Sequence, residues 1–306
     1  MYGVIDIGSN TIRLVIYKVD ESKIVAMLNK KVAVGLVGYI DKNNCMKKKG
    51  MHIAVQALKE FEEIISYMSI EEIFPFATAS IRNIENCQEV INYIREHTKF
   101  DAKVLSGNEE ATFDYFGAIQ SVDMDSGLLV DVGGGSTELV FYQNKKIVST
   151  HSLPIGSLNL YREFVKGICP TKSEIEAIRQ KVIKELNCVN IESESICAQP
   201  LCAVGGTARA IYKLLLHKGK LDADSPEYAC RNLSKLLRGA TENPDRLSRL
   251  ILKISPDRIH TFIPGLILFH TIANHYESET IITSQYGVRE GYLHFLLQER
   301  GELYGG

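Results

Sequence analysis

The sequence lacks the long apolar runs and the cysteine pairs that mark several large classes of protein. No segment of the 306 residues approaches the roughly 20 consecutive apolar residues that a membrane-spanning helix needs. The seven cysteines are an odd number and include no C-x-x-C pair, which argues against a disulfide framework and a zinc site. The start of the chain also lacks a charged leader followed by an apolar segment. We therefore expect a cytoplasmic protein in a reducing compartment, without a membrane partner.

The chain also has no large excess of positively or negatively charged residues. The formal net charge is −2, so no global field attracts nucleic acid, and we expect no nucleic-acid partner. Any polyanion that binds must be held by local groups. The chain does have a hydrophobic fraction of 45%, typical of globular proteins with well-developed cores. Its length is sufficient for about two domains of ordinary size.

The stretch Leu128–Tyr142, LLVDVGGGSTELVFY, carries the most distinctive local pattern. Two apolar runs flank a turn with three glycines, which predicts a strand, a small-residue turn and a second strand. Consecutive glycines let backbone N–H groups converge on an anion. The flanking carboxylates Asp131 and Glu138 would repel a bare phosphate, and therefore suggest a metal ion or an activated water. An ordinary glycine-rich hairpin is the alternative interpretation.

A second copy of this pattern lies near the N-terminus. The segment VIDIGSNTIRLVIY aligns with it without a gap, so that Asp6 corresponds to Asp131. Two later segments, FATASIRNI and AVGGTARAI, align at nearly the same offset and place Arg82 opposite Arg209. Separate segments that repeat at one spacing indicate a duplicated domain.

The repeat predicts an α/β protein of two domains, residues 1–124 and 125–287. Hydrophobic periodicity predicts alternating strands and helices, with helices over Pro226–Gly239 and Val288–Glu299 in the second half. We expect the C-terminal helix within residues 288–306 to return and pack on the first domain. If the domains face each other, both glycine turns point into one central cleft.

The segment Ser106–Glu109 matches a capping box at the start of a helix predicted over Glu109–Val122. The box occupies Glu109 and leaves the adjacent Glu110 free to point elsewhere. A carboxylate at a helix N-terminus stays ionised, as a general base must be. Alternatively, Glu110 merely complements the helix dipole, worth a few tenths to about 1 kcal/mol.

The segment Gly205–Thr207 follows a buried strand and opens a helix. Backbone N–H groups at such a turn suit a phosphate or a nucleotide. Close packing of the strand against the helix is an equally good explanation for the small residues.

The motifs VIDIGSNTIRLVIY, ATASIRN, VLSGNEEATFDYFGAI, LLVDVGGGSTELVFY, AVGGTARAI and VREG follow one another as in the exopolyphosphatase/guanosine pentaphosphate phosphohydrolase (Ppx/GppA) family, which the chain resembles over about residues 1–291. The family belongs to the actin-like ATPase superfamily. The resemblance implies two duplicated ribonuclease-H-like domains facing a central cleft, in a short, two-domain form, and it suggests a homodimer.

The resemblance also implies roles for individual residues. Glu110 matches the catalytic base that activates the attacking water. Asp131 and Glu138 match the acidic pair that orients this water and binds Mg²⁺ or another divalent cation. The candidate phosphate-binding residues are Asp6, Gly8, Ser9, Asn10, Arg13, Arg82, Gly133, Gly134, Gly135, Ser136, Gly205, Gly206, Thr207 and Arg289. For Arg13 and Arg289, a surface or inter-domain ion pair is the alternative.

Several positions depart from the family pattern. Ala33, Leu36, Asn159 and Gln285 stand where relatives often carry charged or polar residues. We expect these departures to remove charge near the cleft and to affect substrate affinity and chain-length preference.

The resulting prediction is an exopolyphosphatase that hydrolyses the terminal phosphoanhydride of inorganic polyphosphate with Mg²⁺. Guanosine pentaphosphate presents the same terminal anhydride and is the alternative substrate. A kinase or ATPase of the same superfamily, or a protein that binds guanosine pentaphosphate without turnover, also stays open.

Overall fold

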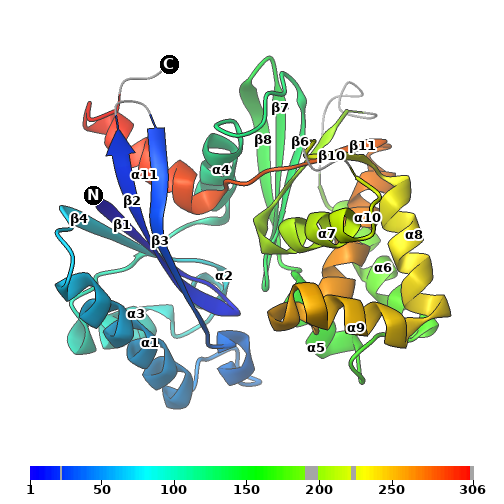
Figure 1. Ribbon diagram of the computed structural model, residues 1–306. Helices are drawn as coiled ribbons and strands as arrows, with labels where there is room; N and C mark the ends of the chain where they lie inside the picture. The colour runs from blue at the N-terminus through cyan, green and yellow to red at the C-terminus, as the bar shows by residue number, and fades with distance from the viewer. Residues whose placement is uncertain (21–22, 190–198, 222–224, 304–306) are drawn as a thin grey trace.

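The computed structural model describes residues 1–20, 23–189, 199–221 and 225–303. It contains two mixed sheets, each flanked by helices, that lie side by side (Figure 1). In spatial order, the strands of the first sheet are β3 (Lys23–Ala33), β2 (Thr11–Asp20), β1 (Tyr2–Ile7), β4 (Glu72–Ala77) and β5 (Lys103–Val104). Those of the second sheet are β10 (Glu227–Ala229), β11 (Thr280–Thr283), β9 (Leu201–Val204), β6 (Gly127–Val132), β7 (Thr137–Gln143) and β8 (Lys146–Leu153).

The helices follow the sheets in two groups. In the first half they are η1 (Leu36–Tyr39), α1 (Lys48–Ser66), α2 (Ala79–Arg82), α3 (Cys87–His97) and α4 (Gly107–Ala118). In the second half they are α5 (Ser157–Phe164), α6 (Lys172–Leu186), α7 (Gly205–His217), α8 (Arg231–Glu242), α9 (Pro244–Ile254), η3 (Pro256–Arg258), α10 (Phe262–His275) and α11 (Val288–Glu299). Within the described residues, no helix has both the length and the apolar character to span a bilayer.

The two sheets share one topology, which confirms the internal repeat. In each sheet three antiparallel strands are followed by two parallel ones, and β10 adds a further edge strand to the second. The register repeats too, since Asp6 in β1 lies opposite Arg13 in β2 and Asp131 in β6 lies opposite Glu138 in β7. The matching turns therefore lie at equivalent edges of the two sheets.

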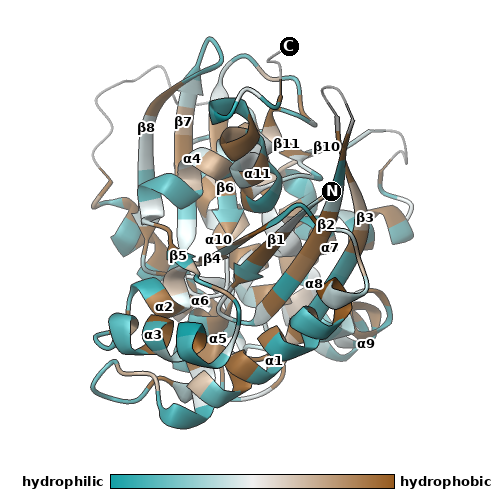
Figure 2. Ribbon diagram, turned by 90° about the vertical axis from the view of Figure 1, so that its left-hand side faces the viewer, coloured by the Kyte–Doolittle hydropathy of each residue, from teal (hydrophilic) through white to brown (hydrophobic). Residues whose placement is uncertain are grey.

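Each sheet buries its outer face under its own helices. Apolar residues of β1 and β2 pack with α1 and α3, and those of β6, β7 and β9 pack with α5 to α10. Figure 2 shows hydrophobic colour concentrated on strands such as β1, β2 and β7, whereas α1 and α3 carry much hydrophilic surface. This amphipathic pattern is what the helical periodicity of the sequence predicts.

The inner faces of the two sheets are covered by exchanged helices. Helix α4 follows the first sheet, yet its Tyr115 packs with Leu129 and Val140 of the second. Helix α11 follows the second sheet, yet its Leu293 packs with Phe76 of the first. Figure 1 accordingly shows α4 and α11 together between the two sheets.

The backbones of α4 and α11 touch where the helices cross. A Cβ on Gly291 would lie 1.8 Å from the Phe113 carbonyl oxygen, and one on Gly117 would lie 2.2 Å from the Gly287 carbonyl oxygen. Glycine is therefore required for this crossing, because any side chain would push the two helices apart.

The helix predicted over Pro226–Gly239 is wrong at its start. The segment Glu227–Ala229 forms β10 and pairs antiparallel with β11, and α8 begins only at Arg231. Tyr228 is buried in the core of the second half, so burial and edge pairing override the helical propensity of this segment. The helix predicted over Glu109–Val122 also ends earlier, at Ala118.

Candidate active site

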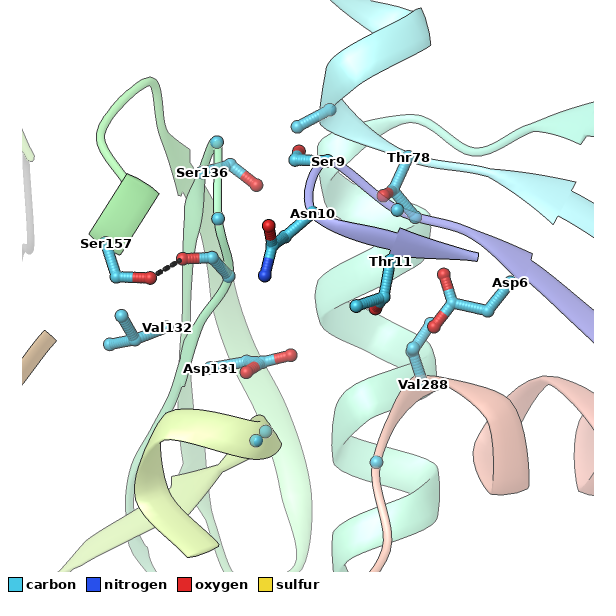
Figure 3. Close-up of a pocket in the computed structure, with 18 of the residues that line it drawn as sticks. Asp6, Ser9, Asn10, Thr11, Thr78, Asp131, Val132, Ser136, Ser157 and Val288 are labelled. Atoms are coloured by element: carbon cyan, nitrogen blue, oxygen red, sulfur yellow. Dashed lines mark hydrogen bonds between the residues drawn. The ribbon is translucent and has the colours of Figure 1, made fainter. Parts of the chain in front are cut away.

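A cleft between the two sheets is lined by residues from both halves of the chain. Its walls come from the ends of β1 and β6, the turns after them, and the N-terminal parts of α4, α7 and α11. Figure 3 shows Asp6 and Asp131 on opposite sides of this cleft, each pointing toward the space between them. The cleft thus forms where the duplicated turns face each other.

The two turns have the same backbone geometry. The Gly8 N–H donates to the Thr11 carbonyl at 3.1 Å, and the Gly133 N–H donates to the Ser136 carbonyl at 3.0 Å. The turns also touch, since a Cβ on Gly135 would lie 2.8 Å from the Ser9 hydroxyl oxygen. A side chain at Gly135 would therefore separate the two halves at this point.

The start of α5 fixes the glycine turn of the second half. The Ser157 hydroxyl donates to the Gly133 carbonyl at 3.0 Å, as Figure 3 shows. The Asn159 amide donates to the Gly135 carbonyl at 3.1 Å, and its oxygen accepts from the Gly156 N–H at 2.7 Å. Asn159, expected above only as a lost charge, thus holds the turn in place.

Glu110 lines the cleft from the first turn of α4. The capping box is present, with Ser106 and Glu109 bonded to each other as predicted. Glu110 is 7% exposed, and its carboxylate accepts a 2.5 Å bond from the Arg82 guanidinium. Burial raises the pKa of Glu110 to about 7, although Arg82 acts in the opposite direction. A carboxyl group with this pKa is matched to proton transfer near neutral pH.

Asp131 and Glu138 lie next to each other across β6 and β7. One Glu138 oxygen accepts from the Ser152 hydroxyl at 2.9 Å and lies 3.6 Å from Arg82. Asp131 lies against Gly205, where a Cβ would be only 2.0 Å from its Oδ1. Burial raises the pKa of both carboxyl groups, and the neighbouring Glu110 raises that of Glu138 further.

These carboxylates fit a divalent cation. Asp131 Oδ1 and Glu138 Oε2 are buried and make no hydrogen bond with the described part of the chain. Unpaired carboxylate oxygens in such surroundings are the ligands that Mg²⁺ prefers. Among the described residues, no group of three or more His, Cys, Asp or Glu side chains could hold a metal ion. The protein would therefore supply one or two carboxylates, and water or substrate the rest, as is usual for Mg²⁺.

Four arginines also line the cleft: Arg13, Arg209, Arg258 and Arg289. Arg289 donates to Asp6 at 2.8 Å and so joins α11 to β1, the ion pair that was its alternative explanation. Arg209 donates to the carbonyls of Ser284 and Gln285 at 3.4 and 3.2 Å. Among the described residues, Arg13, Arg209 and Arg258 form no ion pair with a carboxylate.

Comparison with known proteins agrees with this geometry. The sequence model of the Ppx/GppA phosphatase family matches residues 15–299. The chain belongs to the Ppx/GppA phosphatase family. Membership of this family supports an enzyme that hydrolyses phosphoanhydrides.

Relatives of known structure establish the fold. The structure of the Aquifex aeolicus Ppx/GppA family member has a TM-score of 0.80 at 24% identity, covering 98% of both chains. An exopolyphosphatase structure from Cytophaga hutchinsonii has a TM-score of 0.83 at 23% identity, covering 97% of this chain and 98% of its own. The predicted two-domain α/β fold of actin-like type is therefore confirmed.

A curated relative is longer than this chain. The bifunctional 3-dehydroquinate synthase/phosphatase of Fusobacterium nucleatum is 29% identical over 301 residues, which cover 92% of this chain. The chain spans 44% of the length of that protein.

The Ppx/GppA cleft brings together most of the candidate site residues. Those that line it are Asp6, Gly8, Ser9, Asn10, Arg13, Glu110, Asp131, Gly133, Gly134, Gly135, Ser136, Gly205, Gly206 and Arg289. Arg82 and Glu138 lie just behind the wall, paired with Glu110 and Ser152. Thr207 is fully buried, and its hydroxyl accepts a 3.3 Å bond from Arg258, so packing accounts for its place in the GGT turn.

Three charged residues of the cleft were not predicted from the sequence of this Ppx/GppA protein. Arg209 corresponds to Arg82 in the repeat, and that correspondence could have marked it. Asp114 lies four residues after Glu110, a spacing that puts both on one helix face. Nothing in the sequence marks Arg258 as a cleft residue, because it belongs to no motif. It reaches the cleft because η3 packs there.

Leu36 and Gln285, two of the departures from the family pattern, are not among the residues that line the cleft. Leu36 is fully buried in the core of the first half. The backbone carbonyl of Gln285, rather than its side chain, contacts Arg209.

Proposed function

We propose that this Ppx/GppA protein is an exopolyphosphatase that releases the terminal phosphate of inorganic polyphosphate with the help of Mg²⁺. One observation carries the proposal: a buried carboxylate whose pKa is about 7 shares a cleft with three guanidinium groups that form no ion pair within the described part of the chain. The exopolyphosphatase activity in the name of the Cytophaga hutchinsonii protein supports the same substrate class.

The arginines suit a substrate with several adjacent negative charges. Burial and the neighbouring Arg289 lower the pKa of Arg13 to about 10, and burial lowers the pKa of Arg209 and Arg258. Like charges held together away from water favour an anion that lies among them. A chain of phosphates offers such an anion at each position along the cleft.

Glu110 is the proposed general base. It takes a proton from a water whose oxygen attacks the terminal phosphorus, while the bond from that phosphorus to the bridging oxygen breaks. The released polyphosphate keeps the bridging oxygen. Arg82 orients Glu110 through the 2.5 Å bond, and the glycine turns offer backbone N–H groups to the transferred phosphoryl group.

Asp131 and Glu138 would hold the divalent cation. When bound, Mg²⁺ neutralises phosphate charge and positions the substrate. The two buried, unpaired carboxylate oxygens described above support this assignment.

The test compares wild type, Glu110→Gln and Glu109→Gln on long-chain polyphosphate, guanosine pentaphosphate and ATP, with phosphate release as the readout. Glu109 is the matched control, since it caps the same helix and pairs with Lys103 outside the cleft. We expect polyphosphate turnover to fall by about 10²-fold or more in Glu110→Gln, as loss of a general base predicts, and to persist in Glu109→Gln.

Other outcomes would change the assignment. Faster turnover of guanosine pentaphosphate than of polyphosphate would make the nucleotide the substrate. Turnover of ATP alone would indicate a kinase or ATPase. Tight binding without turnover, unchanged by Glu110→Gln, would indicate a sensor and contradict the role of Glu110.

A further inference from the structure

Thr78 is a cleft residue to which the proposed reaction gives no role. It follows β4, lines the cleft and is only 6% exposed. Its N–H donates to the Ile7 carbonyl at 3.3 Å, which places Thr78 at the edge of the first sheet where β1 ends. Figure 3 shows it on the same wall of the cleft as Ser9 and Asp6. A hydroxyl that is this deeply buried is expected to have a hydrogen-bond partner.

The Thr78 hydroxyl does not cap the helix that it precedes. Thr78 is the N-cap residue of α2, a position where a threonine hydroxyl usually accepts a bond from a backbone N–H of the first turn. That bond is absent here, and the Arg82 N–H donates to the Thr78 carbonyl at 2.9 Å. Within the described part of the chain, the hydroxyl has no hydrogen-bond partner. Its oxygen is not sealed inside the protein either, and it therefore faces the cleft.

The second half of the chain has no hydroxyl at the equivalent position. Thr78 corresponds to Gly205 in the repeat, and a Cβ on Gly205 would lie 2.0 Å from Asp131 Oδ1. The glycine leaves room for Asp131 on the wall where the carboxylates gather. The first half keeps a side chain at this position, and that side chain carries a hydrogen-bond donor.

The wall around Thr78 suits a phosphoryl group. Asp6 is paired with Arg289 at 2.8 Å, so its carboxylate is neutralised. Arg13 lies opposite Asp6 across β1 and β2 and lines the cleft, as does the Ser9 hydroxyl. The oxygens of an ionised phosphoryl group accept hydrogen bonds and do not donate them, whereas a hydroxyl donates one. A phosphoryl oxygen is therefore a suitable partner for the Thr78 hydroxyl.

We propose that the Thr78 hydroxyl binds the phosphoryl group that the enzyme transfers, by donating a hydrogen bond to one of its non-bridging oxygens. This inference rests on the proposed function, in which that group is the terminal phosphate of the substrate. Arg82, at the end of the same short helix, holds Glu110 at 2.5 Å. Helix α2 thus carries a ligand of the phosphoryl group at one end and the residue that orients the base at the other.

The test compares wild type, Thr78→Val and Thr78→Ser. Valine has nearly the shape of threonine but lacks the hydroxyl, which serine keeps. The measurements are kcat/KM for long-chain polyphosphate and, by titration calorimetry in the presence of Mg²⁺, the affinity for inorganic phosphate. We expect both to fall by about 10- to 100-fold in Thr78→Val, as loss of a hydrogen bond to a charged group predicts, and to stay within about threefold of wild type in Thr78→Ser.

Thr271→Val is the matched control. Thr271 is buried in α10 outside the cleft, and its hydroxyl has no hydrogen-bond partner among the residues that the structure describes. The control removes the same group from a buried threonine, and we expect it to bind phosphate and to turn over polyphosphate as wild type does.

Thermal melting separates binding from a structural role. Thr78→Val should melt at the wild-type temperature, because the hydroxyl has no protein partner in the described part of the chain. A structural role would lower the melting temperature of Thr78→Val and leave the phosphate affinity of the folded variant unchanged. Wild-type phosphate affinity and kcat/KM in folded Thr78→Val would overturn the inference.

The two proposals can fail separately. A protein that binds inorganic phosphate through Thr78 but releases none from polyphosphate, guanosine pentaphosphate or ATP would overturn the proposed function and leave the site. A protein that releases phosphate from polyphosphate equally well as wild type and as Thr78→Val would overturn the inference and leave the phosphatase.

Discussion

A variant of Arg82 tests how the cleft sets the pKa of Glu110. The resemblance to the family gives it a phosphate-binding role, whereas the structure pairs it with Glu110 at 2.5 Å and brings it within 3.6 Å of Glu138. Replacement by glutamine removes the charge and keeps a hydrogen-bonding side chain. The two roles predict different dependence of activity on pH.

The size of the effect follows from the ion pair. A cation within hydrogen-bond distance lowers a carboxyl pKa by about 1–3 units, so Arg82→Gln should raise the pKa of Glu110 by that amount. The base form of Glu110 is needed, and in wild type it accumulates as pH rises through about 7. With the pKa raised, kcat/KM at pH 7 should fall by about 5- to 500-fold and recover as pH rises toward the new value.

The assay is the pH profile of kcat/KM for polyphosphate between pH 5 and about 10, the range that covers the shifted limb. Arg95→Gln is the matched control, because Arg95 is exposed on α3 and, among the described residues, hydrogen-bonds only to Asn92. A loss of the same size at every pH, with an unshifted acid limb and a raised KM, would refute the reasoning and favour phosphate binding by Arg82.

Two glycine substitutions test the geometry of the site. Gly205→Ala, at φ +87° with its Cβ 2.0 Å from Asp131 Oδ1, should displace Asp131, lower phosphate release by about tenfold or more and destabilise the fold by about 1–3 kcal/mol. Gly219→Ala, at φ +61° in open space, should cost stability but keep activity, and equal kinetics for the two variants would argue against a role for Gly205. Gly291→Ala should lower the melting temperature, because its Cβ would meet the Phe113 carbonyl oxygen at 1.8 Å. Gly239→Ala, helical and unobstructed, should instead gain about 0.5–1 kcal/mol, and a Gly291→Ala protein as stable as wild type would contradict the close crossing of α4 and α11.

The architecture was predictable from the sequence because many residues of the repeat, such as the turn glycines, determine the local conformation of the backbone. Gly8 and Gly133 make the same turn, and the strands on either side pair in the same register. Such residues act locally, so their spacing is readable without knowledge of the tertiary structure. The capping box before Glu110 is local in the same sense and was predicted correctly.

The parts that were missed depend on contacts distant in the chain. Arg258 reaches the cleft because its guanidinium lies on Gly206, more than fifty residues earlier, as the 1.8 Å approach of a Cβ there shows. The strand β10 exists because Tyr228 is buried and its neighbours pair with β11. No local pattern reports either contact.

The two copies of the repeat differ in what their equivalent side chains contact. Arg82 and Arg209 occupy equivalent positions, but Arg82 binds Glu110 and Arg209 binds backbone carbonyls at the end of the second sheet. Equivalent positions in a duplicated fold therefore share a backbone conformation but not their contacts, because different residues surround each side chain.

The exchange of α4 and α11 has a consequence for synthesis of the protein. The cluster that contains Val4, Phe74 and Phe76 is completed by Leu293 and Leu297, which follow those strand residues by more than two hundred positions in the chain. A nascent chain therefore exposes this apolar face of the first sheet until α11 has been synthesised. Contacts of such long sequence separation slow folding and prolong exposure to aggregation. The first half therefore cannot complete its core before the second half has been made, and α11 determines when the first domain is complete.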